Sequence, residues 1–266
     1  MNRVDKARVQ AAFSRGAERY DAHAVAQATA RERVAALLAR HAPRARRVLD
    51  VGAGTGALAA RLAARDPGLQ LALADLAPGM CATARAAVRG AAVVTADAEA
   101  LPFPDRRFDA VVTSSTFQWL TRLEPALAEG RRVLAADGLI VVALFAERTL
   151  RELREAWLHV AGPAGAARMH RFFRRDEVAA AIADAGLDLL ALEEEEIVER
   201  HPDARAVLHA IRAVGAGNAV PRTGGGGLGG RRVTLALLDR YDAVHGGSDG
   251  VPATYHVVYA VARRPT

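Results

Sequence analysis

The sequence contains very little cysteine and very little lysine. Cys81 is the single cysteine in 266 residues, which excludes an internal disulfide framework and a cysteine-based zinc cluster, so we expect no metal. Lys6 is the only lysine among 36 basic residues, and alanine is abundant. This pairing indicates a drift of composition toward arginine and alanine. The net charge of +6 therefore favours an acidic partner only in general terms.

Long apolar runs are also missing. No run of about eighteen apolar residues occurs, so we expect no transmembrane helix and no membrane partner. The first residues, MNRVDKARVQAAF, lack the apolar core of a signal peptide, which predicts a cytoplasmic protein. Aromatic residues make up 5% of the chain, which does not favour base stacking on nucleic acid. A hydrophobic fraction of 51% is enough for one large domain over residues 1–266.

Short apolar segments alternate with helical ones through the first half of the chain. Two segments of helical spacing come first and form an N-terminal helical segment over 1–42. Glycines then stop the first buried strand. The pattern predicts strands at 46–51, 69–76, 91–97, 109–115 and 139–145, with helices at 56–65, 80–88 and 124–134 and a turn at 136–138. This alternation predicts an α/β, Rossmann-like, mostly parallel sheet.

The second half completes the sheet and adds an insertion. Helices are expected at 149–160 and 176–185, and strands at 187–198 and 254–263, which makes seven strands in all. Residues 200–250 read as an insertion before the last strand, with helices at 203–214 and near 231–244 around a glycine-rich loop, TGGGGLGG (223–230). No Lys-Ser/Thr follows these glycines, so they are not a P-loop. We expect the insertion to form a lid over the substrate side.

The segment VLDVGAGTG (48–56) is the strongest local signal. A strand ends in glycines and a helix starts directly afterwards, so the backbone can approach a ligand at the helix N-terminus. A nucleotide is expected at this carboxyl end of the sheet. The spacing alone is ambiguous, because Gly52, Gly54 and Ala57 also satisfy the G-x-G-x-x-A pattern of NAD-binding enzymes.

Aspartates at three successive strand ends decide between these cofactors. Asp50 can bond a cationic amino-acid group but would face a pyrophosphate badly, Asp75 can accept from ribose hydroxyls, and Asp97 can accept from an adenine amino group. Together they resemble the class I S-adenosylmethionine (SAM)-dependent methyltransferases. The resemblance implies SAM as cofactor, bound by Asp50, Gly52, Ala53, Gly54, Gly56, Asp75, Leu76, Met80, Asp97, Ala98, Glu99 and Ser114.

Further segments resemble one methyltransferase family. FSRGAERYDAHAVAQ (13–27), FQWL (117–120), HRFFRRDEV (170–178), LHAIRAVGAGN (208–218) and ATYHVVYAVAR (253–263) are similar to the malonyl-acyl-carrier-protein O-methyltransferases of biotin synthesis. This resemblance implies that the free carboxylate of a malonyl thioester on an acidic acyl carrier protein is methylated. The glycine-rich loop at 223–230 departs from the family's pattern.

A carboxylate substrate changes what the active site must contain. Its pKa lies near 4, so it is ionised at neutral pH and no catalytic base is needed. Selecting it calls for a cation, and an arginine fork suits a carboxylate. The candidate substrate residues are Arg171 and Arg212, with Tyr20, His23, Gln118, Trp119, Tyr255 and His256 as lining.

Two other functions stay open from the sequence. A methyltransferase of the same fold acting on a quinone, a phenol or another carboxylic acid is the nearest alternative, and a SAM-binding regulator without catalysis is the second. Methylation of nucleic acid is disfavoured, because SSTFQW (114–119) lacks the Asn/Asp-Pro-Pro-aromatic motif. We therefore expect no nucleic-acid partner.

Overall fold

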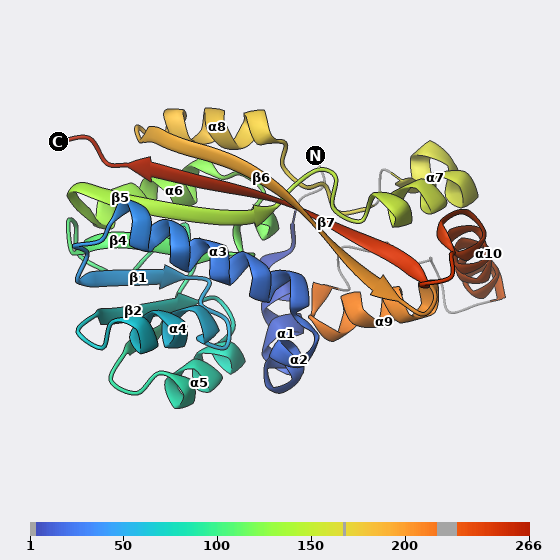
Figure 1. Cartoon of the computed structure of the whole chain (residues 1–266), viewed down its shortest axis with the longest axis horizontal. Coiled ribbons are helices and arrows are strands. Elements are labelled where there is room, and N and C mark those ends of the chain that lie inside the picture. Colours follow the sequence, from blue (N-terminus) through green and yellow to red (C-terminus); the bar gives the residue numbers. More distant parts are fainter. Residues whose placement is uncertain (1–3, 167–168, 217–227) are drawn as a thin grey trace.

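The fold is a seven-stranded sheet with helices on both faces, seen in a computed structural model that describes residues 4–166, 169–216 and 228–266 (Figure 1). The strand order is β3-β2-β1-β4-β5-β7-β6, with β1 to β5 parallel and β7 antiparallel to both neighbours. The strands are β1 (Arg47–Val51), β2 (Gln70–Asp75), β3 (Ala92–Thr95), β4 (Phe108–Ser114), β5 (Leu134–Phe145), β6 (Asp188–His201) and β7 (Val251–Arg263). The predicted Rossmann-like, mostly parallel sheet is confirmed.

Alternating side chains bury the two faces of the sheet under different helices. Val48 on β1 packs on the face covered by α3 and α4, whereas the next residue, Leu49, packs on the face covered by α6 and α8, as the period of two requires. The helices of this sandwich are α3 (Val25–His41), α4 (Ala57–Arg65), α5 (Pro78–Ala87), α6 (Glu124–Val133) and α8 (Arg175–Asp184).

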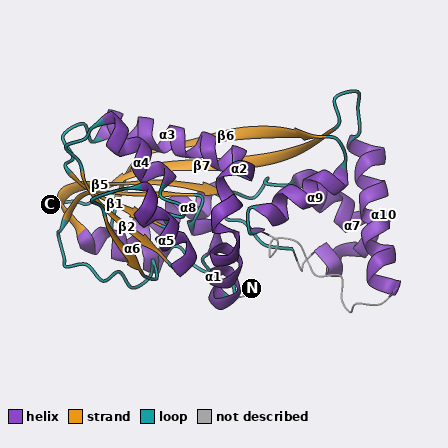
Figure 2. Ribbon diagram, turned by 90° about the horizontal axis from the view of Figure 1, so that it is seen from below, coloured by secondary structure: helices purple, strands orange, loops and turns teal. Residues whose placement is uncertain are grey.

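The remaining helices lie around the carboxyl end of the parallel strands. They are α1 (Lys6–Gly16), the 3-10 turn η1 (Ala17–Arg19), α2 (Tyr20–His23), the 3-10 turn η2 (Phe117–Trp119), α7 (Arg151–Ala166), α9 (Ala204–Ala213) and α10 (Leu228–His245). The antiparallel pair β6 and β7 extends beyond the rest of the sheet, and α7, α9 and α10 gather at its far end (Figure 2). None of the described helices is long and apolar enough to cross a membrane.

The structure differs from one predicted turn, and one predicted loop falls mostly outside the described residues. Residues 136–138 belong to β5, where Asp137 adopts a left-handed φ of 59° and the register against β4 shifts. Strand β5 therefore begins at Leu134, directly after α6, and continues across this irregularity. The predicted glycine-rich loop at 223–230 falls mostly outside the described residues, and its last three residues begin α10. The helices of the insertion, α9 and α10, lie between β6 and β7 as predicted.

Candidate active site

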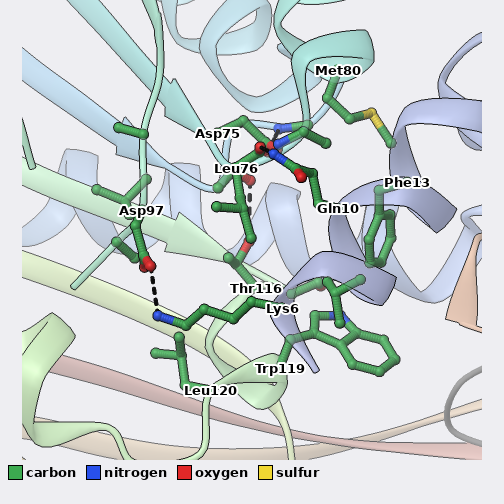
Figure 3. A pocket seen from close by; sticks show the side chains of 18 of the residues that line it. Lys6, Gln10, Phe13, Asp75, Leu76, Met80, Asp97, Thr116, Trp119 and Leu120 are labelled. Atoms are coloured by element: carbon green, nitrogen blue, oxygen red, sulfur yellow. Dashed lines mark hydrogen bonds and ion pairs between the residues drawn. The ribbon is translucent and has the colours of Figure 1, made fainter. Parts of the chain in front are cut away.

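A cavity with about 790 Å³ of empty space, including its open mouth, lies at the carboxyl end of β1, β2 and β4 (Figure 3). Its walls come from the glycine loop after β1, the ends of β2 and β3, the segment after β4, and helix α1. Eight of the predicted cofactor residues line it, namely Gly52, Gly54, Asp75, Leu76, Met80, Asp97, Ala98 and Ser114.

The glycine loop takes its shape from backbone conformations that side chains disfavour. Gly52, Gly54 and Gly56 have φ values of 72°, 56° and 83°, the left-handed region that glycine enters without steric cost. The side chain of Thr116 lies directly against Gly52 and its hydroxyl donates to the Gly52 carbonyl at 3.1 Å. Gly56 does not line the cavity; its bare Cα lets α4 lie close to Ala84 of α5.

Asp75 holds the glycine loop in place. One of its carboxylate oxygens accepts from the Gly54 N–H at 2.8 Å and the other from the Ala77 N–H at 2.8 Å. Burial raises the pKa of Asp75, and these two N–H donors oppose the shift. Each carboxylate oxygen has a further lone pair, so Asp75 can position the loop and still accept from hydroxyl groups of a ligand in the cavity.

Asp50 faces a second, adjoining cavity, which Ala53 and Ser114 also line. Its carboxyl is buried, and its Oδ2 atom has no hydrogen-bond partner among the described residues. Burial, with a smaller contribution from the charge of Asp75, raises the pKa of Asp50 to about 7, while Arg31 opposes the shift. A buried carboxyl oxygen without a partner is costly, so this atom is well suited to accept from a cationic donor.

Asp97 and Glu99 meet a cation that the sequence pattern did not predict. Lys6, on α1, donates to both carboxylates, at 2.6 Å in the case of Asp97 (Figure 3). Gln10, one helical turn later, donates to the Leu76 carbonyl at 2.8 Å. Helix α1 therefore closes one side of the first cavity through polar contacts.

Two more residues of the N-terminal segment lie beside Asp50 and were also missed. Gln27 and Arg31 project from α3 into the second cavity, and Arg31 lies 3.4 Å from Asp21. Their i, i+4 spacing places them on one helix face, but nothing in the local sequence shows that this face is turned toward the glycine loop.

A third cavity adjoins the first two and leads toward α9. Tyr20 and Ser115 line all three cavities, so they mark the point where the cavities meet. Of the predicted substrate residues, Gln118, Trp119 and Tyr255 also line this third cavity. Its remaining walls are mostly apolar and come from Phe13, Phe145, Leu150, Phe172, Ile211, Val214 and Ala216, with the polar Gln27 and Thr149.

Four predicted substrate residues lie elsewhere. Arg171 is exposed and bonded to Glu177, and Arg212 is exposed on α9, whose inward face is apolar. His23 is exposed on α2 beside His209. These corrections share one cause, because each side chain leaves its helix or loop on the side away from the cavity.

His256 is the fourth of these residues. It is buried on β7 but points to the face opposite Tyr255, because successive strand residues alternate. There its ring nitrogens lie near Arg148 and 3.0 Å from Glu194. Burial, followed by the charge of Arg148, lowers the pKa of His256. Among the described residues, no arginine lines the third cavity.

Comparison with known proteins identifies the family. Residues 49–142 match the model of a methyltransferase domain. A malonyl-[acyl-carrier protein] O-methyltransferase of Geobacter sulfurreducens is 48% identical, over 98% of this chain and 100% of that protein. This chain belongs to the malonyl-[acyl-carrier protein] O-methyltransferase family. A biotin biosynthesis bifunctional protein of Cellvibrio japonicus is 33% identical over 98% of this chain and 51% of that protein.

Solved structures agree on the fold of this O-methyltransferase. A candidate methyltransferase of Bacillus halodurans matches with a TM-score of 0.61 and 19% identity, covering 88% of this chain and 100% of the other. The [4+2]-cyclase SpnF matches with a TM-score of 0.55 and 22% identity, covering 88% of this chain and 81% of the other. At these identities the likeness shows the fold alone, and family membership rests on the sequence relatives.

The residues present fit SAM, the methyl donor of this enzyme class. The first cavity combines apolar walls with the acceptors Asp75 and Asp97, as a nucleoside requires. The second cavity is smaller and is lined by Asp50, with its buried, unpartnered oxygen, and by Arg31. A carboxylate and a cation side by side suit the amino and carboxylate groups of a zwitterionic amino acid. NAD, by contrast, would place the negative charge of its pyrophosphate against the carboxylate of Asp50, which is unfavourable.

Proposed function

We propose that this protein transfers the methyl group of SAM to the free carboxylate of malonyl-acyl carrier protein, an early step of biotin synthesis. The meeting of the three cavities at Tyr20 and Ser115 is the observation that carries the mechanism. A nucleoside in the first cavity and an amino-acid end in the second would put the sulfonium at this junction. The third cavity is then the path of the acyl group.

Bound SAM supplies an electrophilic methyl group on a positively charged sulfur. The malonyl carboxylate is already ionised, so this chain has to hold one of its oxygens in line with that methyl group, at roughly 3–3.5 Å, and to exclude water. The apolar walls of the third cavity, including Leu150, Phe172 and Ile211, would exclude the water. No residue needs to remove a proton.

We infer that neutral donors, rather than an arginine, hold the carboxylate. Burial raises the pKa of Tyr20 to about 12, so its hydroxyl stays protonated and can donate at neutral pH. Gln27 and Trp119 stand near it as further N–H donors. Neutral donors orient the carboxylate but withdraw less charge from its oxygens than a guanidinium would, which preserves the nucleophile. The sulfonium supplies the attracting charge.

The activity has a direct test. Incubated with SAM and malonyl-acyl carrier protein, the enzyme should raise the mass of the carrier by one methyl group in place of one proton. Carrier loaded with an acetyl group is the matched control and should not change, because it has no free carboxylate. If the malonyl carrier is left unmodified while a quinone or a phenol is methylated, the proposed substrate is wrong.

A Tyr20→Phe variant tests the carboxylate donor. We expect kcat/KM for the malonyl carrier to fall roughly 10- to 100-fold, because a hydrogen bond to a charged group contributes about 1.5–3 kcal/mol. SAM affinity, measured by calorimetry, should be unchanged. Tyr259→Phe is the control, since that hydroxyl donates to Glu195 away from the cavities.

Two outcomes would contradict this assignment. If Tyr20→Phe weakens SAM binding as much as kcat/KM, Tyr20 serves the cofactor. If it keeps full activity while Arg154→Gln loses it, a cation holds the carboxylate after all. Arg154, on α7, is partly buried and donates to the carbonyl of His170 at 3.0 Å, and the His170 ring packs on Trp119 with centroids 4.9 Å apart.

The lid remains a proposal for part of the insertion. Ile211 of α9 and Val214, the residue directly after this helix, cover the third cavity. Helix α10 instead packs against α7 and β7, where Tyr241 donates to the Pro252 carbonyl at 2.6 Å. We propose that α9, at the edge of the acyl path, is the part of the insertion that closes over the substrate.

A further inference from the structure

Helix α9 separates apolar and basic residues onto two faces. Its buried face consists of Ala204, Val207, Leu208 and Ile211. Its exposed face carries Arg205, His209 and Arg212, which are spaced i, i+4 and i+7 and so lie along one side of the helix. We call these three residues the α9 stripe.

The end of α1 and the turns that follow it continue this basic surface. Gly16 lies close to Ala213 at the end of α9: a Cβ added to Gly16 would be 3.8 Å from the Ala213 carbonyl oxygen. The rings of His23 and His209 lie 6.2 Å apart. Arg15 and Arg19, on this same segment, are exposed. The two elements that present these arginines also supply the third cavity with Phe13, Tyr20, Ile211 and Val214.

Some arginines of the described surface pair with carboxylates of this chain, and others do not. Elsewhere arginine side chains commonly pair with carboxylates, for example Arg47 with Asp109 and Arg132 with Asp105 at 2.7 Å. Neither Arg205 nor Arg212 lies within 4.0 Å of a carboxylate that the structure describes. An exposed cationic stripe of this kind attracts an anionic partner.

We propose that the α9 stripe is the docking surface for the acidic carrier protein, which rests on the proposed function. The stripe and the cavity-lining Ile211 lie on different faces of α9, and a helix is roughly 10 Å across. A carrier held on the outer side would therefore be about one helix diameter from the third cavity. The acyl arm then enters between α1 and α9, while the charged body of the carrier stays on the surface.

Charge reversal of the stripe tests this docking. The double variant Arg205→Glu/Arg212→Glu should raise KM for malonyl-acyl carrier protein about tenfold or more, because attraction becomes like-charge repulsion. Its rate with the malonyl thioester of N-acetylcysteamine, which lacks the carrier, should equal that of the wild type. The KM of the wild type should rise with salt. Arg40→Glu/Arg44→Glu is the control, with the same change of net charge on exposed residues at the far end of α3 and just beyond it.

The outcomes separate the two proposals. Equal KM values for the stripe variant and the control variant overturn docking at the stripe and leave the activity intact. An equal loss with the carrier and with the small thioester also overturns it, because the arginines would then act on the malonyl group itself. If the wild type methylates neither substrate, the proposed function fails and the docking proposal fails with it.

Discussion

Alanine at Gly52 should abolish stable folding of the glycine loop, whereas alanine at Gly54 should leave the fold nearly intact and abolish cofactor binding. A Cβ at Gly52 would lie 2.1 Å from the Cγ2 atom of Thr116, and the three atoms nearest to it all belong to the Thr116 side chain. Such an overlap forces β1 and the segment after β4 apart. Overpacking of this kind costs about 1–3 kcal/mol or more, in addition to the strain of a left-handed backbone.

Gly54 has the same backbone conformation but a different environment. Its φ is 56°, and no atom lies within 4 Å of an added Cβ, because Gly54 borders both the first and the second cavity. Alanine there costs the fold only the left-handed strain, about 1–2 kcal/mol. Its methyl group would, however, occupy the space that the cofactor needs.

Thermal unfolding and SAM calorimetry on the two variants separate these effects. We expect a large loss of Tm for Gly52→Ala and a small one for Gly54→Ala, with SAM binding below detection in the folded Gly54→Ala protein. The double variant Gly52→Ala/Thr116→Gly should recover part of the lost Tm, since it removes the clashing atoms. Equal Tm values for the two single variants would contradict the assignment of the clash.

The sequence pattern predicts most of the sheet because the local signals there are strong. Glycines stop β1, and apolar runs of strand length mark β2 and β4, so the expected boundaries lie within about two residues of the structure. The order of the parallel strands then dictates that Asp50, Asp75 and Asp97 share one edge of the sheet. These three aspartates lie together at the cavities because they follow neighbouring parallel strands, and the alternation of strands and helices predicts that parallel order.

The N-terminal contribution could not be predicted in this way. Lys6 and Gln10 reach the cavities because α1 packs at the end of the sheet, and Arg31 because the first turns of α3, which lies on one face of the sheet, reach that end. No periodicity in a helix shows which neighbour its polar face will meet. Lys6 could have been singled out from the sequence, since it is the only lysine in an arginine-rich chain. The sequence could also have excluded one of Tyr255 and His256 as cavity lining, because the side chains of adjacent strand residues point to opposite faces.

Asp50→Asn should weaken SAM binding and stabilise the free protein. The amide keeps the shape of the carboxyl but cannot carry the charge that a cationic amino group requires, so affinity should fall by roughly 5- to 150-fold, or about 1–3 kcal/mol. The free protein gains because the buried carboxyl, with its unpartnered Oδ2, no longer has to ionise. Opposite effects on ligand binding and on stability are the mark of a functional buried charge.

The pH dependence of both quantities follows from the pKa of Asp50. That pKa is about 7 in the folded protein against 3.8 for an unperturbed carboxyl, so the folded state holds more protons than the unfolded state between these values. The contribution of Asp50 to stability is therefore greatest at low pH and declines as pH rises from about 4 to 7. Asp50→Asn removes this contribution to the pH dependence.

SAM affinity should change with pH in the opposite direction. In the wild type it should increase between about pH 5.5 and 7, as Asp50 ionises while the amino group of the ligand, with a pKa near 8, stays protonated. Calorimetric titrations across this range should give a flat profile for Asp50→Asn. A wild-type affinity that is also flat, with normal binding at pH 5.5, would mean that the Asp50 carboxylate does not carry the charge that holds the amino group. Asp75, whose charge also acts on Asp50, would then be the next candidate.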